Sequence, residues 1–259
     1  MMPIARKRKL QLKRESRQIA GRKIRHLRST DRGYYGVLEK PFIRSWAHRR
    51  GVKEYNKSIF GQKRGELIRI IERRLKGRKR LSILDIGCGS CRFLVELRRI
   101  FKDRIELHGI TLAMPFSPEK LEQLRKKVEA ERKRPLDGEE KRVFEEVKQA
   151  SIKIRERIKK HGIKVHIGLA ETHKYREKYD MIFSTETFVH TINPLQALEN
   201  TLNHLKRGGE AYINFGVADF LKGNPKLKER LERQGINITE LARGAYCFRR
   251  IGLNKIKLL

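Results

Sequence analysis

The sequence predicts an α/β fold, in which a doubly wound sheet carries helices on both faces. Two observations predict this class. From residue 81 onward, short apolar runs typical of strands alternate with amphipathic segments typical of helices. The first run, "LSILDIGCG" (81–89), passes through a glycine turn straight into the helical segment "RFLVELRRIF" (92–101). Strands that alternate with helices indicate βαβ units and therefore a parallel sheet.

Further strands are expected at intervals along the chain. They are "IELHGITL" (105–112), "IKVHIG" (163–168), "YDMIFST" (179–185) and "EAYINFG" (210–216). Residues 194–209 have apolar positions at helical spacing, and we expect Gly208-Gly209 to end that helix. The last segment, "GAYCFRRIGLNKIKLL" (244–259), can supply one or two final strands, expected to be antiparallel.

One connection is much longer than a crossover needs. About 50 residues separate the second strand from the third, where roughly 10 to 15 suffice. Ser117-Pro118-Glu119 supplies a helix cap, a proline at the first helical position and an acid in the first turn. This helix should end near Pro135, and a second should run from about 139 to 160. We therefore expect a domain over 64–259 with a helical hairpin inserted at about 117–161, which either lengthens the fold or walls the substrate site.

Two segments precede this domain. Residues 1–30 hold 11 basic side chains and one acid, so they are expected to form a basic arm. Residues 31–63 interleave aromatic and basic side chains. That mixture suits base stacking with phosphate contact, but it equally suits a short subdomain that packs its rings onto the main core. Residues 65–76 are expected to form an amphipathic helix that ends at Gly77.

Charge is the strongest compositional signal. The chain has 63 Lys and Arg against 30 Asp and Glu, a net charge of +33. Residues 1–80 hold 27 basic and 6 acidic side chains, so most of the excess lies in less than a third of the chain. A thermophile-like surface explains many charges of both signs but not this imbalance. The excess favours a polyanion, which we expect to be RNA or a ribosomal particle, over an anionic membrane surface.

The basic residues nearest the N-terminus are the candidate RNA contacts. They are Arg6, Lys7, Arg8, Lys9, Lys13, Arg14, Arg17, Arg22, Lys23, Arg25, Arg49 and Arg50. No apolar run is long enough to span a bilayer, and three cysteines do not make a disulfide framework. We expect a cytoplasmic protein that acts as a monomer on its partner, or a mitochondrial one if residues 1–30 are a transit peptide.

The spacing C-G-S-C at 88–91 raises three thiol chemistries, and none fits well. A redox pair does not need the flanking Asp85-x-Gly-x-Gly, a zinc site lacks a second cysteine pair, and a papain-type nucleophile would be followed by an aromatic residue rather than Arg92. No metal site is therefore predicted. Gly87 and Gly89 instead allow close approach of a ligand to the backbone, and an acid at position 85 suits a positively charged ligand rather than a pyrophosphate.

The stretch "ILDIGCGSCRFLVEL" resembles motif I of the class I S-adenosylmethionine-dependent methyltransferases. The order of the later segments supports the resemblance: a second strand ending "GITL", a third followed by "GLAE", then "YDMIFSTETFVH" and "LNHLKRGGEAYINF". It extends from about residue 64 to 216, and we expect it to continue to the C-terminus. The resemblance implies a Rossmann-like methyltransferase sheet and S-adenosyl-L-methionine as cofactor.

Carried over position by position, the resemblance assigns the cofactor site. The residues that it implies are Asp85, Gly87, Cys88, Gly89, Thr111, Leu112, Ala170, Glu171 and Ser184. Asp85 and the glycine loop would hold the methionine part, the end of strand two the ribose, and Ala170 with Glu171 the adenine. Thr111 stands where an acid is usual, Leu169 where Asp is usual, and Cys91 where a third glycine is usual. These departures leave open a protein that keeps the fold without useful catalysis.

The methyl acceptor is less defined. The segment 184–187 is Ser-Thr-Glu-Thr, not the Asn/Asp-Pro-Pro-Tyr/Phe that cradles an adenine amine, and no cysteine is placed to attack cytosine. A ring nitrogen, an oxygen or a protein group remains. Glu186 and His190 are candidate catalytic or positioning groups, although a Glu-x-x-x-His stretch also occurs in this superfamily without such a role.

The function predicted is an S-adenosylmethionine-dependent methyltransferase acting on rRNA or tRNA, either free or within a ribosomal or pre-ribosomal particle. One alternative is a ribosome- or RNA-binding protein with little or no catalysis. A weaker alternative is a small-molecule or lipid methyltransferase, which "GITL" suggests and which leaves the basic arm unexplained.

Overall fold

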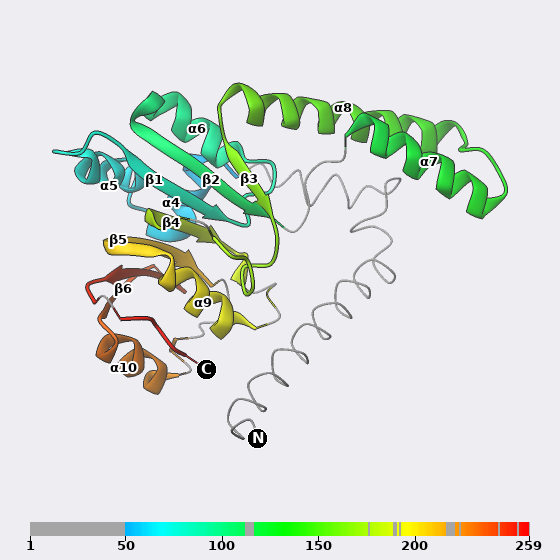
Figure 1. The fold of residues 1–259 in the computed structure, drawn as a ribbon. Helices are drawn as coiled ribbons and strands as arrows, with labels where there is room; N and C mark the ends of the chain where they lie inside the picture. Colours follow the sequence, from blue (N-terminus) through cyan, green and yellow to red (C-terminus); the bar gives the residue numbers. More distant parts are fainter. Residues whose placement is uncertain are drawn as a thin grey trace, which may run out of the picture. The chain divides into compact units, whose positions relative to one another are not determined.

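A computed structural model describes residues 50–111, 117–175, 177–188, 191, 193–215, 221–222, 224–242, 244–252 and 254–258 (Figure 1). The chain divides into two compact units. One comprises residues 1–47 and 116–152, and the other comprises residues 48–115 and 153–259. Among the described residues, no helix is both long and apolar enough to cross a membrane.

The second unit is built on one seven-stranded sheet in the order β3-β2-β1-β4-β5-β7-β6. The strands are β1 (Leu81–Ile86), β2 (Ile105–Thr111), β3 (Lys164–Ile167), β4 (Tyr179–Thr185), β5 (Leu205–Asn214), β6 (Ile236–Ala242) and β7 (Ala245–Arg250). The first five are parallel, and β7 runs antiparallel to both β5 and β6. The predicted doubly wound α/β fold is confirmed, including its antiparallel C-terminal strands.

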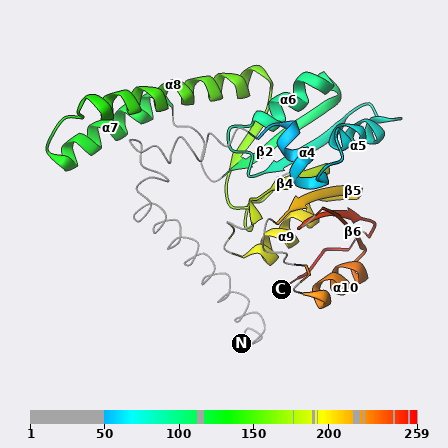
Figure 2. The ribbon, with the colours of Figure 1, turned by 180° about the vertical axis from the view of Figure 1, so that it is seen from behind.

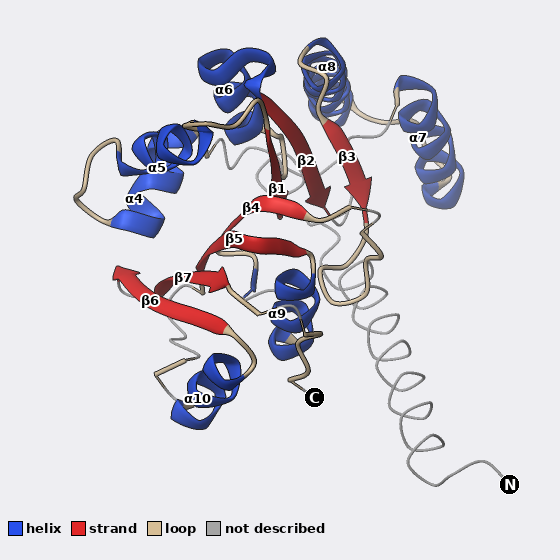
Figure 3. Cartoon of the chain, turned by 60° about the vertical axis from the view of Figure 1, so that its left-hand side comes forward, coloured by secondary structure: helices blue, strands red, loops and turns tan. Residues whose placement is uncertain are grey.

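Helices cover both faces of this sheet (Figure 3). On one face lie α4 (Val52–Phe60), α5 (Glu66–Leu75) and α6 (Arg92–Phe101); on the other lie α9 (Pro194–Asn203) and α10 (Pro225–Arg233). Figure 2 shows the same two layers from behind. Consecutive residues of β1 point to opposite faces of the sheet. Ile83 packs in the core beneath α4, α5 and α6, and Leu84 packs in the core beneath α9 and α10. Every residue of β1 is buried, as expected for a parallel strand covered on both sides.

The described part of the first unit is the predicted helical insertion. It consists of α7 (Pro118–Arg132) and α8 (Gly138–Lys160), whose last turns belong to the second unit. Lys148 of α8 pairs with Glu122 of α7 at 2.8 Å, and both Lys148 and Arg125 lie 5.9 Å from the centre of the Phe144 ring. The two helices therefore contact each other as a hairpin.

The structure differs from the sequence prediction at the end of α9. The sequence predicts a helix that continues to Gly208-Gly209, but α9 ends at Asn203, and β5 begins at Leu205. The glycines lie inside β5, where the pairing with β4 shifts register between Tyr179 and Met181. Gly208 has φ +72°, so these glycines serve a bulge in the strand rather than a helix cap.

The expected boundary after residue 63 falls inside the second unit. Tyr55, Ile59 and Phe60 of α4 are buried in the core on the α5 and α6 face. For the rings of Tyr55 and Phe60, packing onto the main core is therefore the correct one of the two open interpretations. Residues 31–49 lie outside the described residues.

Candidate cofactor site

The predicted cofactor residues gather where parallel strands β1, β2 and β4 end. The backbone N–H groups of Gly87 and Cys88 both donate to the carbonyl of Ile110, at 2.8 and 3.1 Å, so the glycine turn leans over the end of β2. The N–H of Gly168, after β3, donates to the carbonyl of Thr111 at 3.0 Å. Ligands of open α/β sheets bind at this carboxyl edge.

Gly87 cannot be replaced without disturbing this edge. Its φ is +85°, and a Cβ built on it would lie 1.9 Å from Oγ1 of Thr187. That hydroxyl donates to the carbonyl of Ile86 at 3.0 Å, as does the buried hydroxyl of Ser184. Thr187 therefore bonds the loop after β4 to the end of β1, and it lies so close to Gly87 that no side chain fits at that position.

Asp85 is fully buried and only half satisfied. The hydroxyl of Tyr55 donates to its Oδ1 at 2.8 Å, whereas its Oδ2 is buried with no hydrogen-bond partner among the described residues. Burial raises the pKa of Asp85 to about 7, and the Tyr55 hydrogen bond opposes that rise. The Tyr55 ring stacks on Phe93 of α6, with centroids 3.9 Å apart and planes at 4°, which fixes the hydroxyl over the carboxylate.

The two cysteines of the loop are buried and close together. Their Sγ atoms are 3.6 Å apart, and the pKa of Cys88 is raised well above its usual value by the hydrogen bond to Cys91 and by burial. Cys91 takes φ +57° at the cap of α6, the place where a glycine is usual. A buried thiol with a raised pKa is a poor nucleophile, which agrees with a structural role for both residues.

The other predicted cofactor residues lie at neighbouring positions of the same edge. Thr111 is the last residue of β2 and is half-buried. Ala170 and Glu171 are buried beside the start of α9: the Asn200 amide donates to the carbonyl of Ala170 at 2.7 Å, and the N–H of Asn193 donates to Glu171 at 3.4 Å. Leu112 lies outside the described residues.

Glu186 follows β4 in a backbone conformation that is uncommon for its residue type. Its φ is +53°, and a non-glycine residue held there is a frequent mark of a functional site. Its exposed carboxylate forms an ion pair with Arg50, whose side chain is 27% exposed. The second candidate of this loop, His190, lies outside the described residues.

Of the predicted RNA contacts, Arg50 alone falls in the described part of the chain. Its guanidinium is engaged within the protein, by Glu186 and by the carbonyl of Thr185 at 3.5 Å. Its role toward RNA stays a prediction, as do the roles of Arg49 and of the residues between 6 and 25, which lie outside the described residues.

A family described as a methyltransferase domain matches residues 59–241, which is more than half of the chain. The chain belongs to this methyltransferase family. The strand order and the glycine turn after β1 agree with that membership. No curated protein matches the sequence.

Several solved methyltransferase structures are similar to this chain. A Methanococcus maripaludis protein described as an S-adenosyl-L-methionine-dependent methyltransferase is 16% identical, covers 80% of this chain and 92% of its own, and has a TM-score of 0.42. Amino pentose methyltransferase CalS10 from Micromonospora echinaspora, with its cofactor bound, is 17% identical, with 57% and 49% covered and a TM-score of 0.36. A Clostridium acetobutylicum S-adenosylmethionine-dependent methyltransferase is 13% identical, with 71% and 60% covered and a TM-score of 0.38. The chain described here spans about half the length of CalS10.

The residues present fit S-adenosyl-L-methionine, the cofactor of the family. The unpartnered Oδ2 of buried Asp85 offers an acceptor for the ammonium of the methionine part, and the glycine turn leaves backbone close to the ligand. Thr111, at the end of β2, stands at the position that the resemblance assigns to the ribose. When bound, the cofactor supplies an electrophilic methyl group on a sulfonium.

The sequence does not reveal three residues of this site. Tyr55 orients Asp85, Thr187 packs against Gly87, and Arg50 pairs with Glu186. Tyr55 and Arg50 precede the expected domain boundary, in a segment whose alternation of aromatic and basic types is equally typical of RNA contact. Only the position of α4 over the end of β1 reveals their roles. Ser184, by contrast, is predicted to bind the cofactor. In the structure its buried hydroxyl donates to the carbonyl of Ile86 at 3.0 Å.

Proposed function

We propose that this protein transfers the methyl group of S-adenosyl-L-methionine to RNA, either rRNA or tRNA, on its own or within a ribosomal particle. The observation that carries the choice of RNA is the concentration of positive charge in the N-terminal third, with 27 basic and 6 acidic residues over 1–80. Each phosphate neutralised by such residues releases condensed counterions, which drives binding.

The described part of that third agrees with the proposal. Ten of the eleven basic side chains between the start of α4 and the start of β1 are exposed, and the eleventh, Arg74, is half-buried. The exposed ones are Lys53, Lys57, Lys63, Arg64, Arg69, Arg73, Lys76, Arg78, Lys79 and Arg80. Only three acids, Glu54, Glu66 and Glu72, lie in the same stretch. The methyltransferase domain itself therefore carries exposed positive charge in addition to the basic residues of the arm sequence.

The chain's own residues have defined tasks in such a transfer. Asp85 and the glycine turn bind the methionine part and fix the direction of the sulfonium. Glu186 follows β4 and pairs with Arg50, and this proposal gives it the task of a base or of a group that orients the acceptor. Placing acceptor and methyl group in line supplies most of the acceleration in a transfer of this kind.

The test combines cofactor binding, methyl transfer and salt dependence. Full-length protein should bind S-adenosyl-L-methionine in calorimetry and transfer labelled methyl groups to RNA. Deletion of residues 1–30 should weaken RNA binding. It should also make the plot of log affinity against log salt concentration less steep, by about 0.7 in slope for each phosphate of single-stranded RNA that the arm neutralises. Cofactor affinity, measured in parallel, should not change. An unchanged salt slope would show that the arm does not contact RNA.

A second candidate is an RNA-binding protein that keeps the fold with little or no catalysis. It is favoured by Thr111, which offers a single hydroxyl where an acid usually grips both ribose hydroxyls. Titration with the cofactor separates the two candidates: RNA binding without cofactor binding up to millimolar concentrations supports the second and excludes the first.

A further inference from the structure

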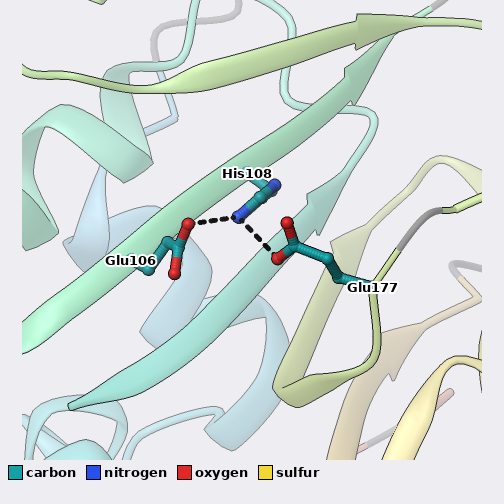
Figure 4. A group of neighbouring side chains, drawn as sticks. All are labelled: Glu106, His108 and Glu177. Carbon is teal, nitrogen blue, oxygen red and sulfur yellow. Dashed lines mark ion pairs between the residues drawn. The ribbon is translucent and has the colours of Figure 1, made fainter.

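A second cluster of polar side chains lies away from the glycine turn. Glu106 and His108 are two residues apart on β2 and therefore project to the same face. Glu177 reaches them from the segment just before β4 (Figure 4). His108 pairs in register with Leu84, which packs in the core under α9, whereas Asp85 faces α4. The cluster and the cofactor residue thus occupy opposite faces of the sheet.

The three ligand-type atoms lie close enough to one another to bind a single metal ion. Nε2 of His108 is 3.3 Å from Oε1 of Glu106 and 3.7 Å from Oε2 of Glu177, and all three atoms lie within 4.8 Å of one another. Zinc binds imidazole nitrogen and carboxylate oxygen at about 2.0 to 2.2 Å, so neighbouring ligands of a tetrahedral ion stand roughly 3.3 to 3.6 Å apart. Both distances from Nε2 exceed ordinary hydrogen-bond lengths.

The histidine supplies a second, independent observation. Its side chain is 2% exposed, yet neither ring nitrogen has a hydrogen-bond partner among the described residues. A buried polar atom without a partner is destabilising, and such atoms often mark a missing ion or water.

We propose that Glu106, His108 and Glu177 bind a divalent ion of the zinc class, with water in the remaining position. One imidazole and two carboxylates suit a first-row transition metal, whereas magnesium and calcium prefer oxygen ligands alone. The ion would give Nε2 of His108 a bonding partner and would link the segment before β4 to β2. Since the ligands come from the sheet face opposite Asp85, the site stabilises the fold and takes no part in methyl transfer.

Lys164 of β3 is the existing cation of this cluster. Its ammonium donates to Oε1 of Glu106 at 2.6 Å, and its side chain is 55% exposed. A carboxylate oxygen has more than one lone pair, so it can accept from Lys164 and bind the ion together. Hydrogen bonds of this kind usually orient ligating carboxylates. Lys164 is therefore expected to support Glu106 as a ligand and not to replace the metal.

The test is zinc binding to the full-length protein. Calorimetry with Zn²⁺ should give one tight site whose affinity falls by more than about 10-fold in both Glu106→Gln and Glu177→Gln, since even outer-shell changes cost that much. Glu177 is 49% exposed before β4, so its conversion to Gln should leave the fold intact. Glu229→Gln, at an exposed position of α10, is the matched control and should bind zinc as the parent protein does.

X-ray absorption at the zinc edge identifies the ligands directly. We expect one imidazole with oxygen ligands near 2.0 Å and no sulfur shell. Absence of tight binding, zinc affinity in the two cluster variants equal to that of the parent, or sulfur in the shell from the cysteines would each overturn the proposal. A rise of the melting temperature with zinc in the parent protein and the Glu229 variant, but not in the cluster variants, would support it further.

Discussion

Replacing Tyr55 by Phe isolates the control of Asp85 by one hydroxyl. Tyr55 donates to Oδ1 of Asp85, while Oδ2 is buried without a partner among the described residues. The ring still stacks on Phe93 in the variant, so the packing of α4 on α6 is retained. The carboxylate, however, loses its one described hydrogen bond, and its pKa of about 7 must rise further.

The size of the rise follows from hydrogen-bond energetics. A bond to a charged group contributes roughly 1.5 to 3 kcal/mol, and about 1.4 kcal/mol corresponds to one pKa unit, so the pKa of Asp85 should rise by roughly 1 to 2 units. A cationic ligand binds the ionised form, so affinity grows with pH until Asp85 is fully ionised. At pH ~7.5 the variant should bind the cofactor roughly 3- to 25-fold more weakly from this cause alone.

Calorimetry of cofactor binding between pH ~5.5 and ~9 measures the effect. In a plot of affinity against pH, the acidic limb should move to higher pH in Tyr55→Phe. The alkaline limb is set by the ligand's α-amino group near pH ~8 and should stay in place. Tyr212→Phe removes another hydroxyl that donates to a carboxylate, that of Glu210, in the groove between α5 and β5, and it should leave the profile unchanged. Coincident acidic limbs in the parent and Tyr55→Phe would refute the argument.

Three further variants test the same edge of the sheet, and a fourth, at Gly77 before β1, serves as a control. Gly87→Val should abolish cofactor binding because its Cβ has no room, whereas Gly77→Val, which meets nothing within 4 Å, should cost stability through its positive φ without affecting binding. Cys88→Ala with Cys91→Ala should bind cofactor nearly as the parent does; a selective loss of activity in this double variant would restore a thiol role. Asp85→Asn should lose cofactor affinity yet unfold at a higher temperature at pH ~8. A buried carboxyl with a raised pKa loses stability as pH rises from ~4 to ~7, and the amide has no such loss. A lower melting temperature at that pH would contradict this reasoning.

The fold was predictable because its signals are local. A buried parallel strand is apolar throughout, and the "DIGCG" turn demands glycine where the chain leaves β1. The inserted hairpin is indicated by its length, its cap at Ser117-Pro118 and its apolar spacing. The end of α9 was missed for a related reason. A glycine pair serves a helix cap and a strand bulge equally well, and only the pairing of β5 with β4 distinguishes them.

The sequence by itself determined the family, the cofactor loop and the charge imbalance, because each resides in contiguous residues. The tertiary structure decided which groups act on one another across the chain. Tyr55 meets Asp85, Arg50 meets Glu186, and Glu177 meets the β2 pair of Glu106 and His108 only through the packing of α4 and the order of the strands. The pKa of Asp85 and the arrangement of ligand-type atoms around His108 depend on burial and on distances of a few ångströms, and no spacing along a chain encodes either one.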